Sequence, residues 1–290
     1  MFTHSPVDAP AIASVTPLGN LNPPGHTLPT NHIYMFHGTP GLPVTAPGTG
    51  RVQTVSRGVD DAVLVQAGAG VSYSLAHVVL DPGITSGLSL TGGQRLGVTS
   101  GVSMAVDLGV SNDAVTLFFV RPERYIQVTI HADSPLKYFQ EPLKSTLYAK
   151  VRRNGADKDG RIDFDRAGRL SGNWFLEGLP VTDTENFANG PKHLAFVRDV
   201  EEPSLVRISI GGSLSVSGAF YVPDGTADPA EIAPSTGVVS YRLLTNPLRT
   251  GTGVGLLLVQ MLADDRIRVE TFAGSATAAT FTAASLVYVR

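Results

Sequence analysis

Short apolar runs separated by glycine turns are the feature that most limits the fold of this chain. The segment AVLVQAGAGVSYSLAHVVL (62–80) shows the pattern, with two runs rich in Val and Leu on either side of Gly68–Gly70. Such runs, bounded by glycine, are typical of strands joined by tight turns. The same texture continues along the chain, which holds 31 Gly and 20 Pro in 290 residues. We therefore expect an all-β protein.

Twelve segments carry this strand signal, each rich in Val, Ile, Leu or aromatic residues and bounded by turn residues. The expected strands are 51–57, 62–68, 71–80, 103–110, 114–120, 168–178, 193–200, 205–212, 238–244, 253–262, 266–272 and 280–290. The residues ADDR (263–266) predict a tight hairpin turn between the last two long runs. One short helix is expected within 134–149, interrupted near Pro142.

Charge divides the chain into two parts. Residues 1–130 contain no Lys, five Arg and seven acidic residues, and the remaining basic and acidic residues follow residue 130. This asymmetry predicts two domains, 1–130 and 131–290. Because the second part has six or more expected strands with short links, we expect a β-barrel or a β-sandwich there.

Composition excludes several classes of protein. Charged residues make up 16% of the chain and the net charge is −3, so a basic nucleic-acid-binding surface is not expected. Cysteine is absent, which excludes disulfides, thiolate metal ligands and cysteine nucleophiles. No apolar run approaches the length of a transmembrane helix. The first residues, MFTHSPVDAPAIASV, lack the features of a signal peptide, and removal of one before residue 1 stays open.

The order of motifs in residues 18–120 resembles the lysostaphin-type zinc endopeptidases, which cut bacterial cell-wall peptide bridges. The matching segments are NHIYMF (31–36), GLPVTAPGTGRVQTV (41–55), AVLVQAGAGVSYSLAHV (62–78), ITSGLSLTGGQRLGVTSG (84–101) and VSMAVDLGV (102–110). The resemblance implies an all-β core, the duplicated hybrid motif. It also implies an exported bacterial protein whose partner is cell-wall glycan or peptide.

The zinc ligands that the resemblance implies are largely missing. In that family the metal is held by a first His, an Asp four residues later, and the second His of His-x-His. Here His32 takes the first position, Phe36 stands where the Asp belongs, and Ser103 and Ala105 align with His-x-His. His77 aligns with a non-ligand His that assists catalysis. No histidine lies between residues 78 and 130, so a small shift of alignment does not restore the ligand.

Two readings of the remaining histidines stay open. His26, His32 and His77 could converge with Asp107 into a rearranged zinc site, because neutral imidazoles suit that metal. Alternatively, these side chains hold the shape of a turn or of a polar pocket. His37, which follows an apolar run and precedes Gly38, is expected to be an exposed loop residue.

The second part offers two weaker signals. The segment GADKDGRIDFD (155–165) partly matches a calcium loop, but Gly155 and Arg166 replace two required acidic ligands, and an acidic turn is the simpler interpretation. The segment GRLSGNWFLEG (168–178) weakly resembles the start of the lipocalin ligand-binding barrels. A small apolar ligand would then be contacted by the aromatic residues that would line a cavity, namely Trp174, Phe175, Phe196 and Tyr241.

Three functions follow from these observations. The first is a non-catalytic binding or interaction protein built on a degenerate peptidase scaffold with a β-barrel. The second is a zinc-dependent hydrolase that uses His26, His32 and His77. The third is a structural exported protein without a small ligand.

Overall fold

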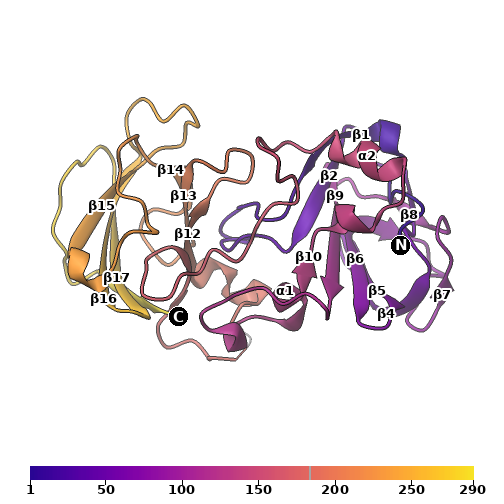
Figure 1. The fold of residues 1–290 in the computed structure, drawn as a ribbon, viewed down its shortest axis with the longest axis horizontal. Coiled ribbons are helices and arrows are strands. Elements are labelled where there is room, and N and C mark those ends of the chain that lie inside the picture. The colour runs from indigo at the N-terminus through magenta and orange to yellow at the C-terminus, as the bar shows by residue number, and fades with distance from the viewer. Residues whose placement is uncertain (183) are drawn as a thin grey trace. The chain divides into compact units, whose positions relative to one another are not determined.

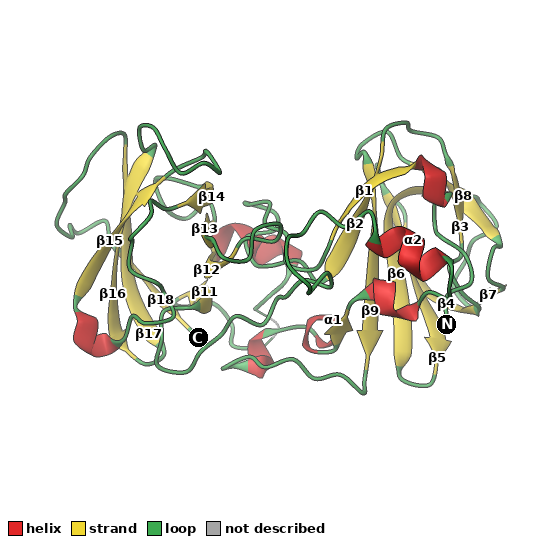
Figure 2. Cartoon of the chain, turned by 45° about the horizontal axis from the view of Figure 1, so that its top comes forward, coloured by secondary structure: helices red, strands yellow, loops and turns green. Residues whose placement is uncertain are grey.

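The computed structural model describes residues 1–182 and 184–290, and its contacts group them into two units (Figure 1). Unit 1 comprises Met1–Leu18, Asn31–Leu117 and His131–Gly160. Unit 2 comprises Gly19–Thr30, Phe118–Ile130 and Arg161–Arg290. Strands dominate both units and the helices are short, so the expected all-β class is confirmed (Figure 2).

Unit 1 is built on one antiparallel sheet. Its main path runs β1-β2-β9-β6-β5-β4-β7, while β8 pairs with β3 and β6, and β10 pairs with β9. The strands are β1 (Ile12–Thr16), β2 (His32–His37), β3 (Pro43–Thr45), β4 (Gly50–Ser56), β5 (Asp61–Gly68), β6 (Val71–Leu80), β7 (Ser89–Leu90), β8 (Arg95–Thr99), β9 (Ala105–Asn112) and β10 (Ala132–Asp133). In β5 buried and half-buried residues alternate, as expected for a strand with one face on the core.

The helical segments are one or two turns long. Unit 1 contains η1 (Ala9–Ala11), η3 (Pro135–Tyr138) and α2 (Leu143–Tyr148). Unit 2 contains η2 (Pro122–Arg124), α1 (Gln127–Ile130), η4 (Phe187–Lys192) and η5 (Pro234–Thr236). The helix expected within 134–149 is confirmed as η3 and α2, and Pro142 stands at the N-cap of α2, where it removes no helical hydrogen bond.

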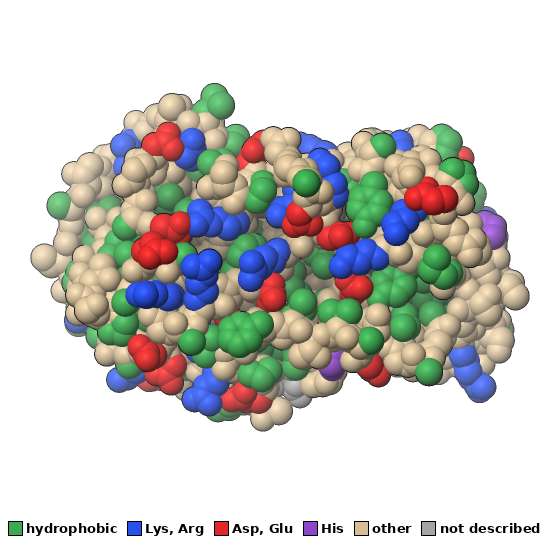
Figure 3. Space-filling model, viewed as in Figure 1, with side chains coloured by type: hydrophobic (Ala, Val, Ile, Leu, Met, Phe, Trp, Pro, Cys, Tyr) green, Lys and Arg blue, Asp and Glu red, His purple; other side chains and the backbone are tan. Residues whose placement is uncertain are grey.

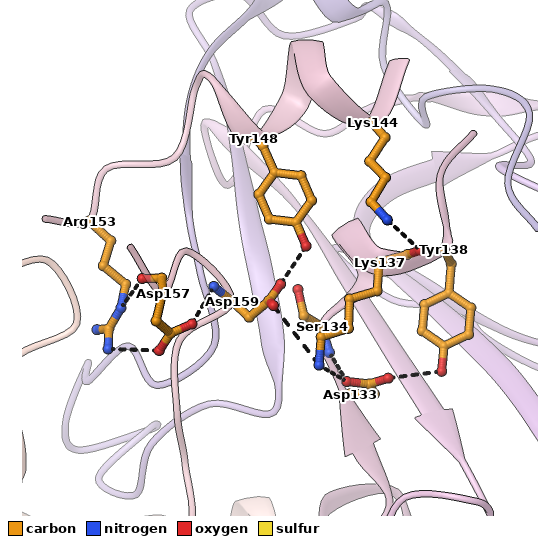
Figure 4. Close-up of polar contacts among 9 residues, drawn as sticks. All are labelled: Asp133, Ser134, Lys137, Tyr138, Lys144, Tyr148, Arg153, Asp157 and Asp159. Carbon is orange, nitrogen blue, oxygen red and sulfur yellow. Dashed lines mark hydrogen bonds and ion pairs between the residues drawn. The ribbon is translucent and has the colours of Figure 1, made fainter. Parts of the chain in front are cut away.

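Polar side chains between β10 and residue 160 bind this segment together (Figure 4). Lys137 Nζ donates to Asp133 Oδ1 at 2.7 Å, and the Tyr138 hydroxyl donates to Asp133 Oδ2 at 3.1 Å. The Tyr148 hydroxyl, on α2, donates to Asp159 Oδ1 at 2.7 Å. Each carboxylate therefore has a fixed donor from η3 or α2, which fixes the irregular end of unit 1 in place.

The strand expected at 114–120 is wrong, because these residues form no strand. Two of their backbone N–H groups donate to carboxylates rather than to a neighbouring strand. Asp163 Oδ2 accepts from Phe118 N at 3.3 Å, and Asp165 Oδ2 accepts from Val120 N at 3.0 Å. An apolar run signals burial, and burial alone does not supply a pairing partner.

The described part of unit 2 forms an eight-stranded antiparallel barrel. Its strands are β11 (Gly172–Leu176), β12 (His193–Arg198), β13 (Val206–Ile210), β14 (Gly218–Tyr221), β15 (Val238–Leu243), β16 (Gly255–Ala263), β17 (Arg266–Ala273) and β18 (Leu286–Val289). The order is β14-β13-β12-β11-β18-β17-β16-β15, so consecutive strands pair and the first strand pairs with the last. Tyr221 and Leu244 exchange two backbone hydrogen bonds of 2.8 and 2.9 Å, which join the remaining edges at β14 and β15.

The turn at 263–266 joins β16 to β17, as expected, with Ala263 opposite Arg266. Of the two architectures expected for the second part, the structure therefore has the barrel. Closure leaves few unpaired strand edges, which protects an all-β domain from edge-to-edge association.

Side chains fill the barrel interior. Alternate residues of the strands meet in one buried cluster, which includes Trp174, Phe196, Tyr241, Leu257 and Tyr288. Trp174 is fully buried, and its Nε1 donates to the Leu170 carbonyl oxygen at 2.8 Å. An interior packed in this way stabilises the barrel through the removal of apolar surface from water.

Arg290 is buried beside this tryptophan. Its guanidinium carbon lies 4.0 Å from the centre of the Trp174 ring. Its nitrogens donate to carbonyl oxygens that include those of Arg166 at 2.7 Å and Arg169 at 2.9 Å. A buried guanidinium saturated by carbonyls and an aromatic face closes one end of the barrel without leaving an unsatisfied charge.

On the face drawn in Figure 3, basic and acidic side chains lie beside one another rather than in separate areas of one charge. Ion pairs such as Arg161 Nε to Asp163 Oδ1, at 2.9 Å, account for part of this mixing. No helix in the described ranges is long and apolar enough to span a bilayer.

We predict that Arg290→Leu lowers the free energy of unfolding of unit 2 by about 3 kcal/mol, because it leaves several buried carbonyl oxygens without donors. Urea unfolding followed by the fluorescence of Trp174, the only tryptophan, measures the change. Arg266→Leu is the matched control, since Arg266 pairs with Glu177 at the surface and should contribute less than about 1 kcal/mol. Equal effects of the two substitutions would contradict this account of Arg290.

A second prediction concerns His193, which is 2% exposed and packs edge-on against Phe175 at 5.0 Å between ring centres. Burial lowers the pKa of His193 to about 4. As pH falls below about 6.5, His193 takes up a proton in the unfolded chain but stays neutral in the folded one. The free energy of unfolding should therefore fall by about 3 kcal/mol between pH 6.5 and pH 4 through this residue.

Burial also raises the pKa of Glu185 to about 7. Glu185 therefore stabilises the folded state at low pH, below its pKa in the unfolded chain, and this contribution is lost as pH rises through 7. The two groups oppose one another, so the test compares His193→Gln with the wild type at each pH. The wild type should lose more stability than the variant between pH 6.5 and pH 4. Parallel pH profiles would show that His193 does not titrate in this way.

Candidate functional site

Three neighbouring strands of unit 1 bring together residues that are far apart in the sequence. The strand β9 lies between β2 and β6. Asp107, on β9, is paired with Tyr34 on one side and with Ala76 on the other. His32 is two residues from Tyr34 and His77 is next to Ala76, so both imidazoles lie beside the carboxylate. Cross-strand pairing thus forms the site, as neighbouring positions on one face of a sheet meet.

Four side chains form a continuous chain of contacts, which we call the His–Asp chain: Asp60, His77, Asp107 and His32. Asp107 Oδ2 lies 3.2 Å from His77 Nε2 and 3.3 Å from His32 Nε2. His77 Nδ1 forms a hydrogen bond with Asp60 Oδ2. At the other end, His32 Nδ1 lies 3.1 Å from the Asn31 side-chain oxygen. One carboxylate oxygen is therefore shared by two imidazoles.

A β-bulge places His77 in the chain. Asp61 pairs with Val78 and Ala62 pairs with Ala76, so His77 is the extra residue of β6. Its φ is 63°, in the left-handed region that residues with a side chain seldom adopt. Such a conformation costs free energy on the order of 1 kcal/mol or more and persists only where the surroundings hold it. The bulge turns the imidazole between two carboxylates, and Ser100 N donates to the His77 carbonyl oxygen at 3.0 Å.

The turn before β5 holds Asp60 in position. Its neighbour Asp61 accepts hydrogen bonds from Gly58 N at 3.1 Å and from Leu80 N at 2.9 Å. Arg57 Nη1 donates to Asp61 Oδ2 at 3.0 Å and to the Leu80 carbonyl oxygen at 2.6 Å. Burial alone would raise the pKa of Asp61, but these hydrogen bonds lower it. The ionised Asp61 ties the turn to β6, which brings Asp60 within reach of His77.

Hydrogen bonds along the His–Asp chain shift the pKa values of two of its members. The hydrogen bond to Asp107 raises the pKa of His77 to about 9 against the opposing effect of burial, and Asp60 adds to the rise. Burial would raise the pKa of Asp107, but hydrogen bonds from His32 and His77 lower it. His77 is therefore an imidazolium at neutral pH, and both of its nitrogens act as donors.

Aromatic side chains continue the same face of β2. The His32 and Tyr34 rings lie 5.0 Å apart, and the Tyr34 and Phe36 rings are stacked at 6.2 Å. Phe36 is half-buried and pairs with Ala105 of β9. Ser103 precedes β9, and its Oγ accepts from Ala105 N at 3.1 Å. The positions that the resemblance assigns to an Asp and to His-x-His are thus filled by an aromatic ring, a serine and an alanine.

These residues do not fit a three-ligand zinc site. A zinc ion needs donor atoms that converge from about 2.0 Å, with lone pairs directed at the metal. Here Asp107 Oδ2 is contacted directly by both Nε2 atoms, at 3.2 and 3.3 Å. Among residues 1–182 and 184–290, no three His, Asp or Glu side chains are arranged to hold a metal ion.

The other histidines of the opening segment lie in different surroundings. His26 belongs to unit 2, and its backbone exchanges hydrogen bonds of 2.9 and 3.0 Å with Asn22 across a turn. The exposed loop position expected for His37 is wrong, because His37 ends β2 and is 1% exposed. Its Nδ1 lies 2.9 Å from the Thr39 carbonyl oxygen, so a local hydrogen bond allows this histidine to be buried.

The acidic turn at 155–160 has its carboxylates engaged by other side chains (Figure 4). Asp157 Oδ2 lies 3.3 Å from Arg153 Nη2, and Asp157 Oδ1 accepts from Asp159 N at 3.0 Å. Asp159 in turn accepts from Tyr148. Gly160 has a φ of 80°, which suits a turn. The geometry is that of an acidic turn held by arginine and tyrosine.

The four aromatic residues expected to line a barrel cavity divide between two faces. Trp174, Phe196 and Tyr241 lie together in the interior cluster. Phe175 points away from it and contacts Tyr125 edge-on at 5.5 Å between ring centres. Alternation along β11 explains the difference, because successive side chains of a strand face opposite sides. Ligand binding by these residues stays a prediction.

Comparison with known proteins gives partial similarities. No family profile matches the sequence, and no curated protein matches it. The Helicobacter pylori Csd3 structure is similar with a TM-score of 0.35 and 18% identity, over 48% of this chain and 35% of that chain. A zinc-containing peptidase from Vibrio cholerae gives 0.31 and 21%, over 38% and 36%. Lysostaphin gives 0.32 and 10%, over 96% and 91%.

The chain thus spans about a third of the length of the first two of these proteins. Two of the three are named as a zinc-containing peptidase and as lysostaphin.

Asp60 is the member of the His–Asp chain that the sequence did not indicate. The pair Asp60–Asp61 was visible as a turn between two strands, which is its commonest meaning. Only the bulge at His77, which no local pattern predicts, brings Asp60 to the site.

We predict that His77 is protonated on both nitrogens at pH 7.5 and that Asp107→Asn lowers its pKa markedly, because the substitution removes the negative charge that favours the imidazolium. Nitrogen-15 NMR of the ring, followed from pH 5 to pH 10, measures the titration. Asp81→Asn is the matched control, since Asp81 is an exposed carboxylate of unit 1 that pairs with Arg95 Nε at 2.9 Å. A wild-type His77 that titrates near pH 6.5 would refute the charge assignment.

Proposed function

We propose that this protein is a non-catalytic binding protein, in which unit 1 uses a peptidase-like scaffold to hold cell-wall glycan or peptide. One observation carries the proposal: a single oxygen of Asp107 is shared by His32 Nε2 and His77 Nε2, at 3.3 and 3.2 Å. In this arrangement the imidazoles are engaged by a carboxylate of the chain itself. The family and its partner class come from the resemblance in residues 18–120.

What metal-dependent hydrolysis requires supports the proposed loss of catalysis. A catalytic zinc site needs three protein ligands and an open position for the water that attacks the peptide. Phe36 supplies no donor atom at the position where the family has a carboxylate, and His32 and His77 are both in contact with Asp107.

Retention of binding is supported by the surface next to the His–Asp chain. Phe36, which is half-buried and stacked on the buried Tyr34 ring, offers an apolar face near charged groups. Met104, 49% exposed, adjoins it, because the Met104 carbonyl oxygen accepts from His37 N at 2.8 Å. Aromatic faces beside polar groups suit both sugar rings and peptide side chains. The barrel of unit 2 would act as a second binding or supporting element.

The alternative is a zinc-dependent hydrolase that uses His26, His32 and His77. The observation that favours it is that the Nε2 atoms of His32 and His77, two of these three imidazoles, lie within 3.3 Å of one oxygen of Asp107. Either function would be exercised outside the cytoplasm, at the bacterial cell wall, after removal of a signal segment. Export is inferred from the resemblance.

We predict that untagged protein, dialysed against zinc and then against buffer, retains far less than one zinc per chain and releases no peptides from purified peptidoglycan. It should nevertheless co-sediment with that peptidoglycan. Phe36→Ala should weaken co-sedimentation about fivefold, the effect of losing roughly 1 kcal/mol of aromatic contact. Elemental analysis, amino-group release and sedimentation provide the three measurements.

Phe118→Ala is the matched control, because Phe118 is an exposed phenylalanine of unit 2. One zinc per chain that is lost in His32→Ala, together with peptide release, would establish the hydrolase instead. If the protein neither retains zinc nor co-sediments with peptidoglycan, the third function, a purely structural protein, is favoured.

A further inference from the structure

One end of the barrel in unit 2 holds a pocket that none of the sites above includes. Its volume is about 230 Å³. Its walls are Ser213, Leu214 and Ser215 from the β13–β14 connection, Glu270 and Thr271 from β17, and Leu286 from β18. The mouth of a β-barrel is a common place for a small-molecule site.

The β13–β14 connection reaches across the barrel end to form the pocket. In the strand order β13 and β17 are not neighbours, yet Ser215 Oγ donates to the Thr271 carbonyl oxygen at 2.6 Å. Val216 N donates to Thr271 Oγ1 at 3.0 Å. The start of the connection is held by Ser213 N, which donates to the Pro191 carbonyl oxygen at 3.1 Å. These bonds hold the wall of the pocket in place before any ligand arrives.

Glu270 contributes a buried carboxylate to this pocket. The residue is 5% exposed, and its oxygens accept from Thr282 N at 2.7 Å and from Thr282 Oγ1 at 2.5 Å. A carboxylate can accept about four hydrogen bonds, so acceptor capacity remains on both oxygens. Two uncharged donors do not neutralise a buried negative charge, which is costly unless a cation compensates it.

No cationic side chain of the described residues forms an ion pair with Glu270. Arg268, two residues away on the same face of β17, bonds to the same segment as Glu270 but forms no ion pair with it. Its Nε donates to Ser285 Oγ at 2.8 Å, its Nη2 donates to the Thr282 carbonyl oxygen at 3.1 Å, and its guanidinium lies 4.5 Å from the centre of the Phe281 ring. Glu270 lines the pocket, so a cation that enters the pocket comes next to this residue.

We propose that this pocket binds a small organic cation, a primary ammonium on a short alkyl body. The ammonium donates to Glu270, and the alkyl carbons pack against Leu214 and Leu286. A polyol would leave the buried charge uncompensated. A divalent metal would need several oxygen ligands, and the pocket offers a single carboxylate. This inference does not depend on the function proposed for unit 1.

Titration calorimetry of the full chain with n-butylammonium chloride at neutral pH tests the proposal, with n-butanol and glucose as uncharged probes. We expect heat of binding for butylammonium and none for the two uncharged probes. Glu270→Gln should weaken butylammonium binding about tenfold or more, the loss expected for a hydrogen bond to a charged group. The amide keeps an acceptor for Thr282, and a thermal melt checks that the barrel still folds.

Two further variants separate the pocket from general surface charge. Ala284, which lies at the exposed side of the pocket, is changed to Phe so that the ring fills the space while Glu270 remains. Ala284→Phe should abolish binding, whereas Glu177→Gln, at an exposed carboxylate of the same unit, should leave it unchanged. Butylammonium binding that survives Ala284→Phe, equal binding of butanol, or no binding by the wild type would each overturn the proposal.

Discussion

The pairing of β9 with both β2 and β6 is the constraint on which the candidate site depends. Because Asp107 stands opposite Tyr34 on one side and Ala76 on the other, its carboxylate meets two imidazoles from different strands. A shift of either pairing by one residue would turn Asp107 to the opposite face of the sheet. The site is thus a property of register, and the buried face of the sheet fixes that register.

The His–Asp chain places one cation between two carboxylates. Carboxylates brought close together repel one another unless a positive charge lies between them. His77 carries such a charge between Asp60 and Asp107. The strained backbone of His77 is held by the same contacts, because both of its ring nitrogens are bonded.

Unit 2 contains two buried charged side chains, Arg290 and Glu270, in different surroundings. Arg290 is saturated by carbonyl oxygens and by the face of Trp174, so one end of the barrel is complete in itself. Glu270, at a rim pocket, has hydrogen-bond donors but no cation among the described residues. Arg290, whose charge is fully compensated, is a structural element. Glu270, which forms no ion pair with a described residue, marks a candidate ligand site.

The amino-acid sequence by itself determined the all-β class, most of the strands, the hairpin at 263–266 and the absence of cysteine chemistry. The resemblance in residues 18–120 implied that Phe36 stands where that family has a carboxylate, and the sequence has no histidine within 78–130. The strand and turn signals are local, because they depend on periodicity and residue type. The strand expected at 114–120 failed because an apolar run cannot tell whether a partner strand or a carboxylate will satisfy its backbone.

Only the tertiary structure decided that Asp107 lies between His32 and His77, that Asp60 joins them, and that His37 is buried. It also decided which of the aromatic residues around Trp174 face the barrel interior, and that Glu270 is enclosed without a cation. Each of these depends on pairings between residues distant in the sequence and on one β-bulge. Such contacts are set by the packing of the whole sheet, and no local pattern encodes them.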